Sequence, residues 1–164
     1  MLIKNANTDR LTQIPNRAYM ILQLEYMMKH SRRNDLPLSV IFLDIDHFKH
    51  INDTYGHRSG DGVLVELSSL MSQRLRESDI LGRWGGEEFV IILPQTALKE
   101  AIGVAEKLRQ MIESHRFDHG KATCSLGVAQ MIEDDTDETL VHRADAMLYV
   151  AKSHGRNQVR PKAE

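Results

Sequence analysis

The sequence predicts an α/β (α+β) domain of the ferredoxin-like kind, with a central, mainly antiparallel sheet flanked by helices. Short apolar runs rich in β-branched residues alternate with stretches of helical periodicity, in the order β-α-β-β-α-β after a first helix. A glycine pair separates two of these runs, as in a hairpin. The length of 164 residues suits one domain. We expect this domain over residues 1–160, with a frayed tail at 161–164.

The first helix and the first strand have clear boundaries. Asn16 is placed to cap a helix, which is predicted from Arg17 to about Arg32 by apolar positions of helical spacing. Residues 34–37, Asn-Asp-Leu-Pro, break this pattern. Residues 38–43 form an apolar run bounded by turn signals, which predicts a buried strand, and the run leads directly into Asp44-Ile45-Asp46.

The later elements follow from the same two periodicities. Residues 47–59 are polar and marked by glycine, and the next helical pattern begins at Asp61 and continues to Arg76. Gly85-Gly86 predicts a hairpin turn. The remaining elements are expected as strands at 80–83 and 89–93, a helix at 98–113, a strand at 122–130, a helix at 139–152 and a short last strand at 158–159.

Composition excludes several classes of function. The 21 Lys and Arg residues against 23 Asp and Glu residues give a net charge of −2, so no basic excess predicts a nucleic-acid or membrane-surface partner. The single cysteine, Cys124, rules out an internal disulfide framework and a four-cysteine zinc site. No stretch approaches the ~20 apolar residues of a membrane span, and residues 1–10 lack a signal-peptide core. The chain is therefore expected to be cytoplasmic.

Two acidic groups are candidates for chemistry. Asp44 and Asp46 end a buried strand on the same side of the chain, where carboxylates can hold Mg²⁺. A helix cap plus a surface acid is the simpler explanation when this pair is taken alone. Glu87 and Glu88 follow the glycine turn, and two adjacent acids there are unfavourable unless they are solvated or neutralised by a cation. An exposed acidic hairpin is the simpler explanation when this motif is taken alone.

Together these motifs make the sequence resemble the GGDEF family, the diguanylate cyclases, over nearly the whole chain. The matching stretches are DRLTQIPNR at 9–17, FLDIDHFK at 42–49, INDTYGH at 51–57, GD at 60–61, RWGGEEF at 83–89, SLGVA at 125–129, ADAMLYVAK at 144–152 and GRN at 155–157. Gln13 departs from the glycine usual in the first stretch, and Glu87 stands where the family's name has Asp, a common active variant.

The resemblance implies a palm-like fold, related to class III nucleotide cyclases, that condenses two GTP into cyclic di-GMP and releases pyrophosphate. Asp44 and Glu87 would hold two Mg²⁺ or Mn²⁺ ions per GTP site, with help from the Ile45 carbonyl and Glu88. Glu87 would also help to deprotonate the 3′-hydroxyl. Arg83 would stabilise charge at the α-phosphate, and a solvated strand residue is the equally weighted alternative.

The resemblance also assigns residues to the substrate. Asn52 and Asp61 match the family's guanine-reading pair, whereas a turn former and a helix-terminal charge are their ordinary explanations. The remaining positions that match the GTP-binding set are Phe48, Lys49, Gly85, Gly86, Lys152 and Arg156. For the last two cations, the simpler role is to complement the end of a helix.

A last motif concerns regulation and assembly. Arg76 and Asp79 stand at the register of the family's inhibitory site for cyclic di-GMP, although an R-x-x-D string usually means a local salt bridge. The resemblance implies a transient homodimer, because each domain brings one GTP, and an upstream sensory or dimerising domain outside this chain. The alternative function is a silent module that binds GTP or cyclic di-GMP without turnover. A scaffold for another nucleotide fits less well, because Asn52 and Asp61 both suit guanine.

Overall fold

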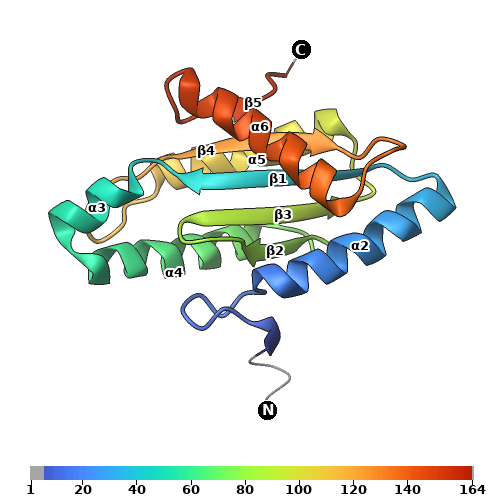
Figure 1. Cartoon of the computed structure of the whole chain (residues 1–164). Helices are drawn as coiled ribbons and strands as arrows, with labels where there is room; N and C mark the ends of the chain where they lie inside the picture. The colour runs from blue at the N-terminus through green and yellow to red at the C-terminus, as the bar shows by residue number, and fades with distance from the viewer. Residues whose placement is uncertain (1–5, 164) are drawn as a thin grey trace.

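The computed structural model describes residues 6–163 and forms one five-stranded sheet with helices on both faces (Figure 1). The strands lie in the order β2-β3-β1-β4-β5. The helices are α2 (Arg17–Asn34), α3 (Phe48–Tyr55), α4 (His57–Arg74), α5 (Leu98–Ser114) and α6 (Asp137–Ser153). The strands are β1 (Leu38–Ile45), β2 (Ile80–Arg83), β3 (Glu88–Pro94), β4 (Cys124–Gln130) and β5 (Val159–Arg160).

The sheet confirms the predicted ferredoxin-like order. β1 lies between β3 and β4 and is antiparallel to both, and β2 pairs with β3 through the glycine hairpin. The short β5 is added at the edge, parallel to β4. Every residue of β1 is buried, as expected for a central strand with helices on both faces. The cap of α2 is also confirmed, because Asn16 Oδ1 accepts the Tyr19 N–H at 3.0 Å.

One region differs from the sequence prediction. The polar segment 47–59 contains the helix α3 and the first turn of α4, which begins at His57 rather than at Asp61. Its residues have weak helix propensity, so no periodic signal marks it. Ile51 is buried in the core and Phe48 packs against it, and these two contacts stabilise the short helix. The helix predicted to reach Arg76 ends at Arg74.

Each face of the sheet has its own apolar core. Alternate residues of β1 point to opposite faces. Ile41, Leu43 and Ile45 belong to the core under α4 and α5, and Val40 and Phe42 belong to the core under α2 and α6. By this alternation Asp44 points toward the α6 face, which places its carboxylate beside the end of that helix.

The beginning of α6 is fixed by a second buried acid, Asp135, of which 6% is exposed. Its carboxylate accepts the Ile132 N–H at 2.9 Å and the Thr139 hydroxyl at 2.8 Å, and it pairs with the Arg143 guanidinium. Burial raises the pKa of Asp135, but these hydrogen bonds outweigh burial and hold it below its ordinary value. This cluster lies at the opposite end of α6 from Lys152.

Within residues 6–163, no helix is both long enough and apolar enough to cross a membrane. The predicted limits of the domain, 1–160, and of the frayed tail, 161–164, reach beyond the described range. Residues 1–5 and Glu164 lie outside it.

Candidate active site

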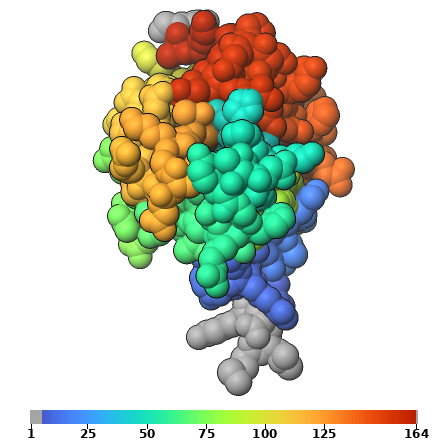
Figure 2. All heavy atoms as spheres, turned by 90° about the vertical axis from the view of Figure 1, so that its left-hand side faces the viewer, coloured from blue at the N-terminus to red at the C-terminus, as the bar shows by residue number. Residues whose placement is uncertain are grey.

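The C-terminal end of β1 brings together the sequence-predicted acids and one of the predicted cations. Asp44 is paired in register with Glu88 of β3 on one side and with Ser125 of β4 on the other. Lys152, near the end of α6, reaches the same carboxylate. Figure 2 looks onto this end of the molecule, where α3 lies between the segment that precedes β4 and the end of α6.

Asp44 carries the strongest electrostatic perturbation of the site. It is 5% exposed, and one of its oxygens, Oδ2, is ion-paired with Lys152. Burial raises its pKa, and the Lys152 ammonium opposes this. The carboxylates of Glu87 and Glu88 raise the pKa again, and the result is a shift from 3.8 to about 6. The strand end therefore holds more negative charge than the lysine neutralises.

The hairpin brings the second group of acids to Asp44. Glu88 is the first residue of β3, and Glu87 precedes it in the turn, where its carbonyl accepts the Ile45 N–H at 3.3 Å. Burial raises the pKa of Glu88, and Asp145 and Glu87 raise it further. Because the carboxylates raise one another's pKa, a cation placed among them would lower the energy of the site.

The residues at this strand end fit a hard cation. Asp44 Oδ1 is buried and has no hydrogen-bond partner among the described residues, although a buried carboxylate oxygen normally has one. Carboxylate and carbonyl oxygens are what Mg²⁺ prefers, and Mg²⁺ keeps several waters besides one or two carboxylates. Within residues 6–163, no three His, Cys, Asp or Glu side chains enclose a point as a complete metal cage. The donor set therefore fits an ion that is shared with a ligand and water.

The guanine-reading candidates lie on the two helices that follow β1. Asn52 is on α3, and its Oδ1 is buried and unpartnered among the described residues. Asp61 is an exposed residue of α4. Gly60, just before it, gives Asn52 its space, because a Cβ atom at position 60 would lie 1.9 Å from Asn52 Oδ1. The Asn52 amide oxygen therefore lies against Gly60, in the place that a side chain at position 60 would take.

The cations that are predicted to bind phosphate differ in their contacts and in their exposure to solvent. Lys152 is ion-paired with Asp44, whereas Lys49 and Arg156 are exposed. Arg83 is engaged with the hairpin itself, because its guanidinium donates to the Gly86 carbonyl at 2.8 Å and pairs with Asp9 at 3.2 Å. The sequence did not predict this role for Asp9. Asp9 lies in the DRLTQIPNR stretch, but no periodicity connects that stretch to the hairpin.

The predicted inhibitory pair lies away from this strand end. Arg76 follows α4, and its guanidinium donates to Asp79 Oδ1 at 2.9 Å, to the Pro94 carbonyl at 3.0 Å and to the Thr96 hydroxyl at 2.8 Å. The salt bridge expected from the R-x-x-D string is therefore present. The Arg76 side chain remains 56% exposed, so part of the guanidinium faces solvent.

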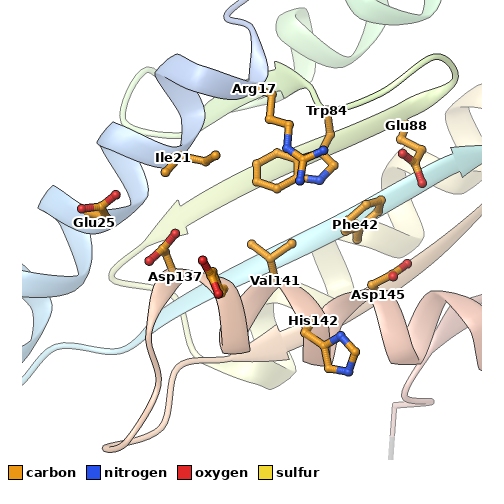
Figure 3. A pocket seen from close by; sticks show the side chains of 11 residues that line it. Arg17, Ile21, Glu25, Phe42, Trp84, Glu88, Asp137, Val141, His142 and Asp145 are labelled. Carbon is orange, nitrogen blue, oxygen red and sulfur yellow. The ribbon is translucent and has the colours of Figure 1, made fainter.

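A groove of about 610 Å³ borders the acidic hairpin on the α2 and α6 face of the sheet. Figure 3 shows Arg17 lying against the ring of Trp84, at 4.6 Å from the centroid, with Phe42 and Val141 between the two helices. Glu88 lines the groove at the site end. No motif in the sequence marks this groove, since its walls come from four separate segments.

Fold and site together define a palm-type α/β domain, in which an antiparallel βαββαβ core carries acids at the end of its central strand and on the facing hairpin. The family model described as "Diguanylate cyclase, GGDEF domain" matches residues 6–158. The chain belongs to the GGDEF family.

Curated relatives cover nearly all of this chain. The response regulator PleD of Caulobacter vibrioides is 44% identical over 165 residues, which are 96% of this chain and 36% of PleD. The diguanylate cyclase DgcP of Pseudomonas aeruginosa is 40% identical over 161 residues, which are 95% of this chain and 24% of DgcP. The chain thus spans about a third of PleD, at 36%, and about a quarter of DgcP, at 24%.

Solved structures agree with the fold. The coiled coil and GGDEF domain of DgcB from Caulobacter crescentus, in complex with c-di-GMP, has a TM-score of 0.92 at 31% identity, covering 96% of this chain and 86% of that one. The active GGEEF domain of a diguanylate cyclase from Vibrio cholerae has a TM-score of 0.85 at 36% identity, covering 90% and 96%.

The raised pKa of Asp44 predicts a stability cost of the site. The fold favours the neutral carboxyl of Asp44. Protonated Asp44 therefore stabilises the folded state fully below its ordinary pKa of 3.8, and this stabilisation is lost as the pH rises through about 6. Asp44→Asn is therefore expected to raise the free energy of unfolding by about 1–3 kcal/mol at pH 7. The difference should vanish near pH 4. Urea unfolding in a chelating buffer from pH 4 to 7 measures it, and a pH-independent difference would contradict the assignment.

Proposed function

We propose that this domain is a diguanylate cyclase, which condenses two GTP into cyclic di-GMP with release of two pyrophosphates. Two buried acceptors without a partner among the described residues, Asp44 Oδ1 and Asn52 Oδ1, carry the proposal. An unpaired buried polar atom costs about 1–3 kcal/mol, so two of them on β1 and the next helix support a bound ligand. Membership of the GGDEF family and the likeness to DgcP support GTP as that ligand.

The acids of the strand end hold the metal ions in this proposal. Asp44 and Glu87 contribute carboxylates, with Glu88 and the Ile45 carbonyl as further oxygen donors, to two Mg²⁺ or Mn²⁺ ions per GTP. Such ions, when bound, activate the attacking 3′-hydroxyl and neutralise charge on the triphosphate. The chain itself contributes by positioning the oxygen donors. It holds the three carboxylates together at a cost in stability, and the pKa of about 6 leaves Asp44 mostly ionised at neutral pH.

The triphosphate is bound by cations from three elements. Lys152 balances Asp44 in the structure, and a phosphate gives it a second anionic partner. Lys49 and Arg156 are exposed and free to rotate toward the phosphates, and the Phe48 and Lys49 N–H groups add donors. The role of Arg83 at the α-phosphate stays a prediction, whereas its hydrogen bonds favour bracing the hairpin. Gly85 and Gly86 let the ligand approach the turn closely.

Guanine is read by an amide and a carboxylate. Asp61 accepts from the N1–H and the 2-amino group, a donor pair that adenine lacks. Asn52 is assigned to the same base, and its amide is held in place by the space that Gly60 leaves. Since one domain holds one GTP, the product forms when two copies face each other, so the active species is a transient homodimer. The intact acids Asp44, Glu87 and Glu88 favour turnover over a module that binds nucleotide silently.

The Arg76 and Asp79 pair is proposed as the product-inhibition site. Asp79 holds the Arg76 backbone N–H at 2.8 Å and its guanidinium at 2.9 Å, which orients the exposed part of that side chain. Guanidinium groups bind phosphate or guanine through paired hydrogen bonds and stack on bases. Cyclic di-GMP bound there would hold two domains in a geometry that keeps their GTP sites apart.

Glu87→Gln is the direct test of the proposed function. The amide keeps the shape but removes a charged metal ligand, so metal-dependent formation of cyclic di-GMP is expected to fall at least ~100-fold. The exposed acid Glu133, changed to Gln, is the matched control and should retain parental activity. Product identification by mass spectrometry with GTP and Mg²⁺ decides the outcome. Parental turnover in the Glu87 variant would refute the metal assignment.

Gly60→Ala tests the guanine pocket without removing a polar group. The added Cβ would displace the Asn52 amide, so the KM for GTP is expected to rise about tenfold. Gly62→Ala, two residues along the same helix, is the control, because a Cβ there meets nothing within 4 Å. Both changes improve helix propensity equally. Equal KM values for the two variants would show that Asn52 does not read the base.

Arg76→Ala tests the inhibitory site. Charge-assisted contacts from Arg76 should supply much of the product affinity, so the cyclic di-GMP concentration for half-inhibition is expected to rise at least ~10-fold. Arg74→Ala, at the exposed end of α4, serves as the control. Initial rates against added product, with calorimetry on the same variants, provide the measurement. Unchanged product affinity would mean that the motif is only a local salt bridge.

A further inference from the structure

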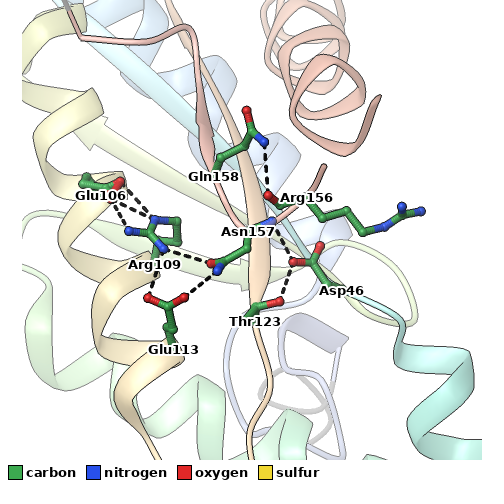
Figure 4. Close-up of polar contacts among 8 residues, drawn as sticks. All are labelled: Asp46, Glu106, Arg109, Glu113, Thr123, Arg156, Asn157 and Gln158. Atoms are coloured by element: carbon green, nitrogen blue, oxygen red, sulfur yellow. Dashed lines mark hydrogen bonds and ion pairs between the residues drawn. The ribbon is translucent and has the colours of Figure 1, made fainter. Parts of the chain in front are cut away.

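Asp46, two residues after Asp44, has a different environment from its neighbour. It is 6% exposed, and both of its carboxylate oxygens accept hydrogen bonds. Oδ1 accepts the Ser125 hydroxyl at 2.6 Å, and Oδ2 accepts the Thr123 hydroxyl at 2.7 Å and the Asn157 N–H at 3.0 Å (Figure 4). Asp46 is therefore satisfied by protein donors, whereas one oxygen of Asp44 has no hydrogen-bond partner within residues 6–163.

The third donor connects Asp46 to an unusual turn. After α6 the backbone takes positive φ at Gly155 (110°), Arg156 (64°) and Asn157 (46°). The left-handed conformation is unfavourable for the two residues with a Cβ, so surrounding contacts must hold them. The Arg156 N–H donates to the Ala151 carbonyl at 3.0 Å, and the Asn157 N–H donates to Asp46. The second of these bonds joins the turn to the end of β1.

The side chain of Asn157 fixes the other side of the turn. Its Oδ1 accepts from Arg109 Nη1 at 2.9 Å, and its amide donates to Glu113 at 2.5 Å. Arg109 is in turn paired with Glu106 at 2.5 Å. Arg109, Glu113 and Glu106 all belong to α5. Figure 4 shows Asn157 between this helix and Asp46, with the Arg156 side chain extending away from the network. The turn is thus held from two elements at once.

We propose that Asp46 is a positioning residue for the phosphate-binding cation Arg156. By accepting the Asn157 N–H, it holds the left-handed turn that carries Arg156 and that follows Lys152, the cation ion-paired with Asp44. Asp46 itself contacts neither ion nor substrate. This inference rests on the proposed function for the identity of the substrate, but the hydrogen-bond network is independent of it.

Asp46→Asn is the decisive variant. An amide has one acceptor oxygen and no charge, so the bond to the Asn157 N–H loses its anionic acceptor whichever way the amide is turned. The KM for GTP is expected to rise about 5–10-fold through misplaced phosphate contacts, with kcat changed less than about threefold. In an Arg156→Ala background, the effect of Asp46→Asn on KM should shrink to less than about twofold, because the two residues act on one contact.

Asp135→Asn is the matched control. Asp135 is also 6% exposed and also accepts from several donors, but it lies at the opposite end of α6. The Asp135→Asn variant should lower the free energy of unfolding without raising the KM for GTP. Hydrogen exchange provides a readout without nucleotide: Asp46→Asn should lose protection at the Asn157 amide, while the amides of β1 and β3 stay protected.

Three results would overturn the proposal. These are equal KM changes in the Asp46 and Asp135 variants, full additivity with Arg156→Ala, and retained protection of the Asn157 amide. If Asp46→Asn does not fold, Thr123→Val replaces it, since the Thr123 hydroxyl donates to the same Oδ2 oxygen that accepts the Asn157 N–H and helps to hold it in place. A rise in KM is expected there as well, and an unchanged KM counts against the inference. A parent chain without GTP turnover would refute the proposed function, and the exchange result would still decide the role of Asp46.

Discussion

The structure depends on one constraint: its central strand is buried along its whole length and ends in acids. β1 has a hydrogen-bonded strand on each side and a helical layer on each face, so a carboxylate at its end loses water on every side. Burying an unpaired charge is costly, and nearby cations or hydrogen-bond donors must offset the cost. The hairpin, the end of α6 and the turn after it all converge on that one strand end.

The two acids of this segment meet the constraint in opposite ways. Asp46 is satisfied by two hydroxyls and a backbone N–H, and behaves as part of the framework. Asp44 has one lysine, two acidic neighbours and an oxygen without a hydrogen-bond partner in the described part of the chain. A framework does not need the second arrangement, because a neutral side chain would be more stable there. The energetic cost is therefore the physical observation that most directly supports the proposed role of Asp44 as a metal ligand.

The sequence predicted the sheet well because strand signals here are local. Apolar runs, a glycine pair and proline boundaries are each readable within a few residues, and the order of the elements then leaves few topologies. Helix α3 escaped prediction because its stability comes from Phe48 and Ile51 packing on a distant core, which no local periodicity records. The positions of Asp44, Glu87 and Asn52 followed from motif register. The pairing of Arg83 with Asp9 did not, because it joins residues 74 positions apart.

The network around Asn157 shows why register alone is incomplete. Its three parts come from the end of β1, from α5 and from the turn after α6. Each looks ordinary when taken alone in the sequence: one of two Asp residues, one Arg on a helix, and one Asn two residues after a glycine. Only the fold brings them within hydrogen-bond distance. Catalytic groups of phosphoryl transfer act mainly through position and charge, so residues that hold cations in place matter as much as the cations. Under the proposed function, that role falls to side chains whose satisfied hydrogen bonds would otherwise mark them as structural.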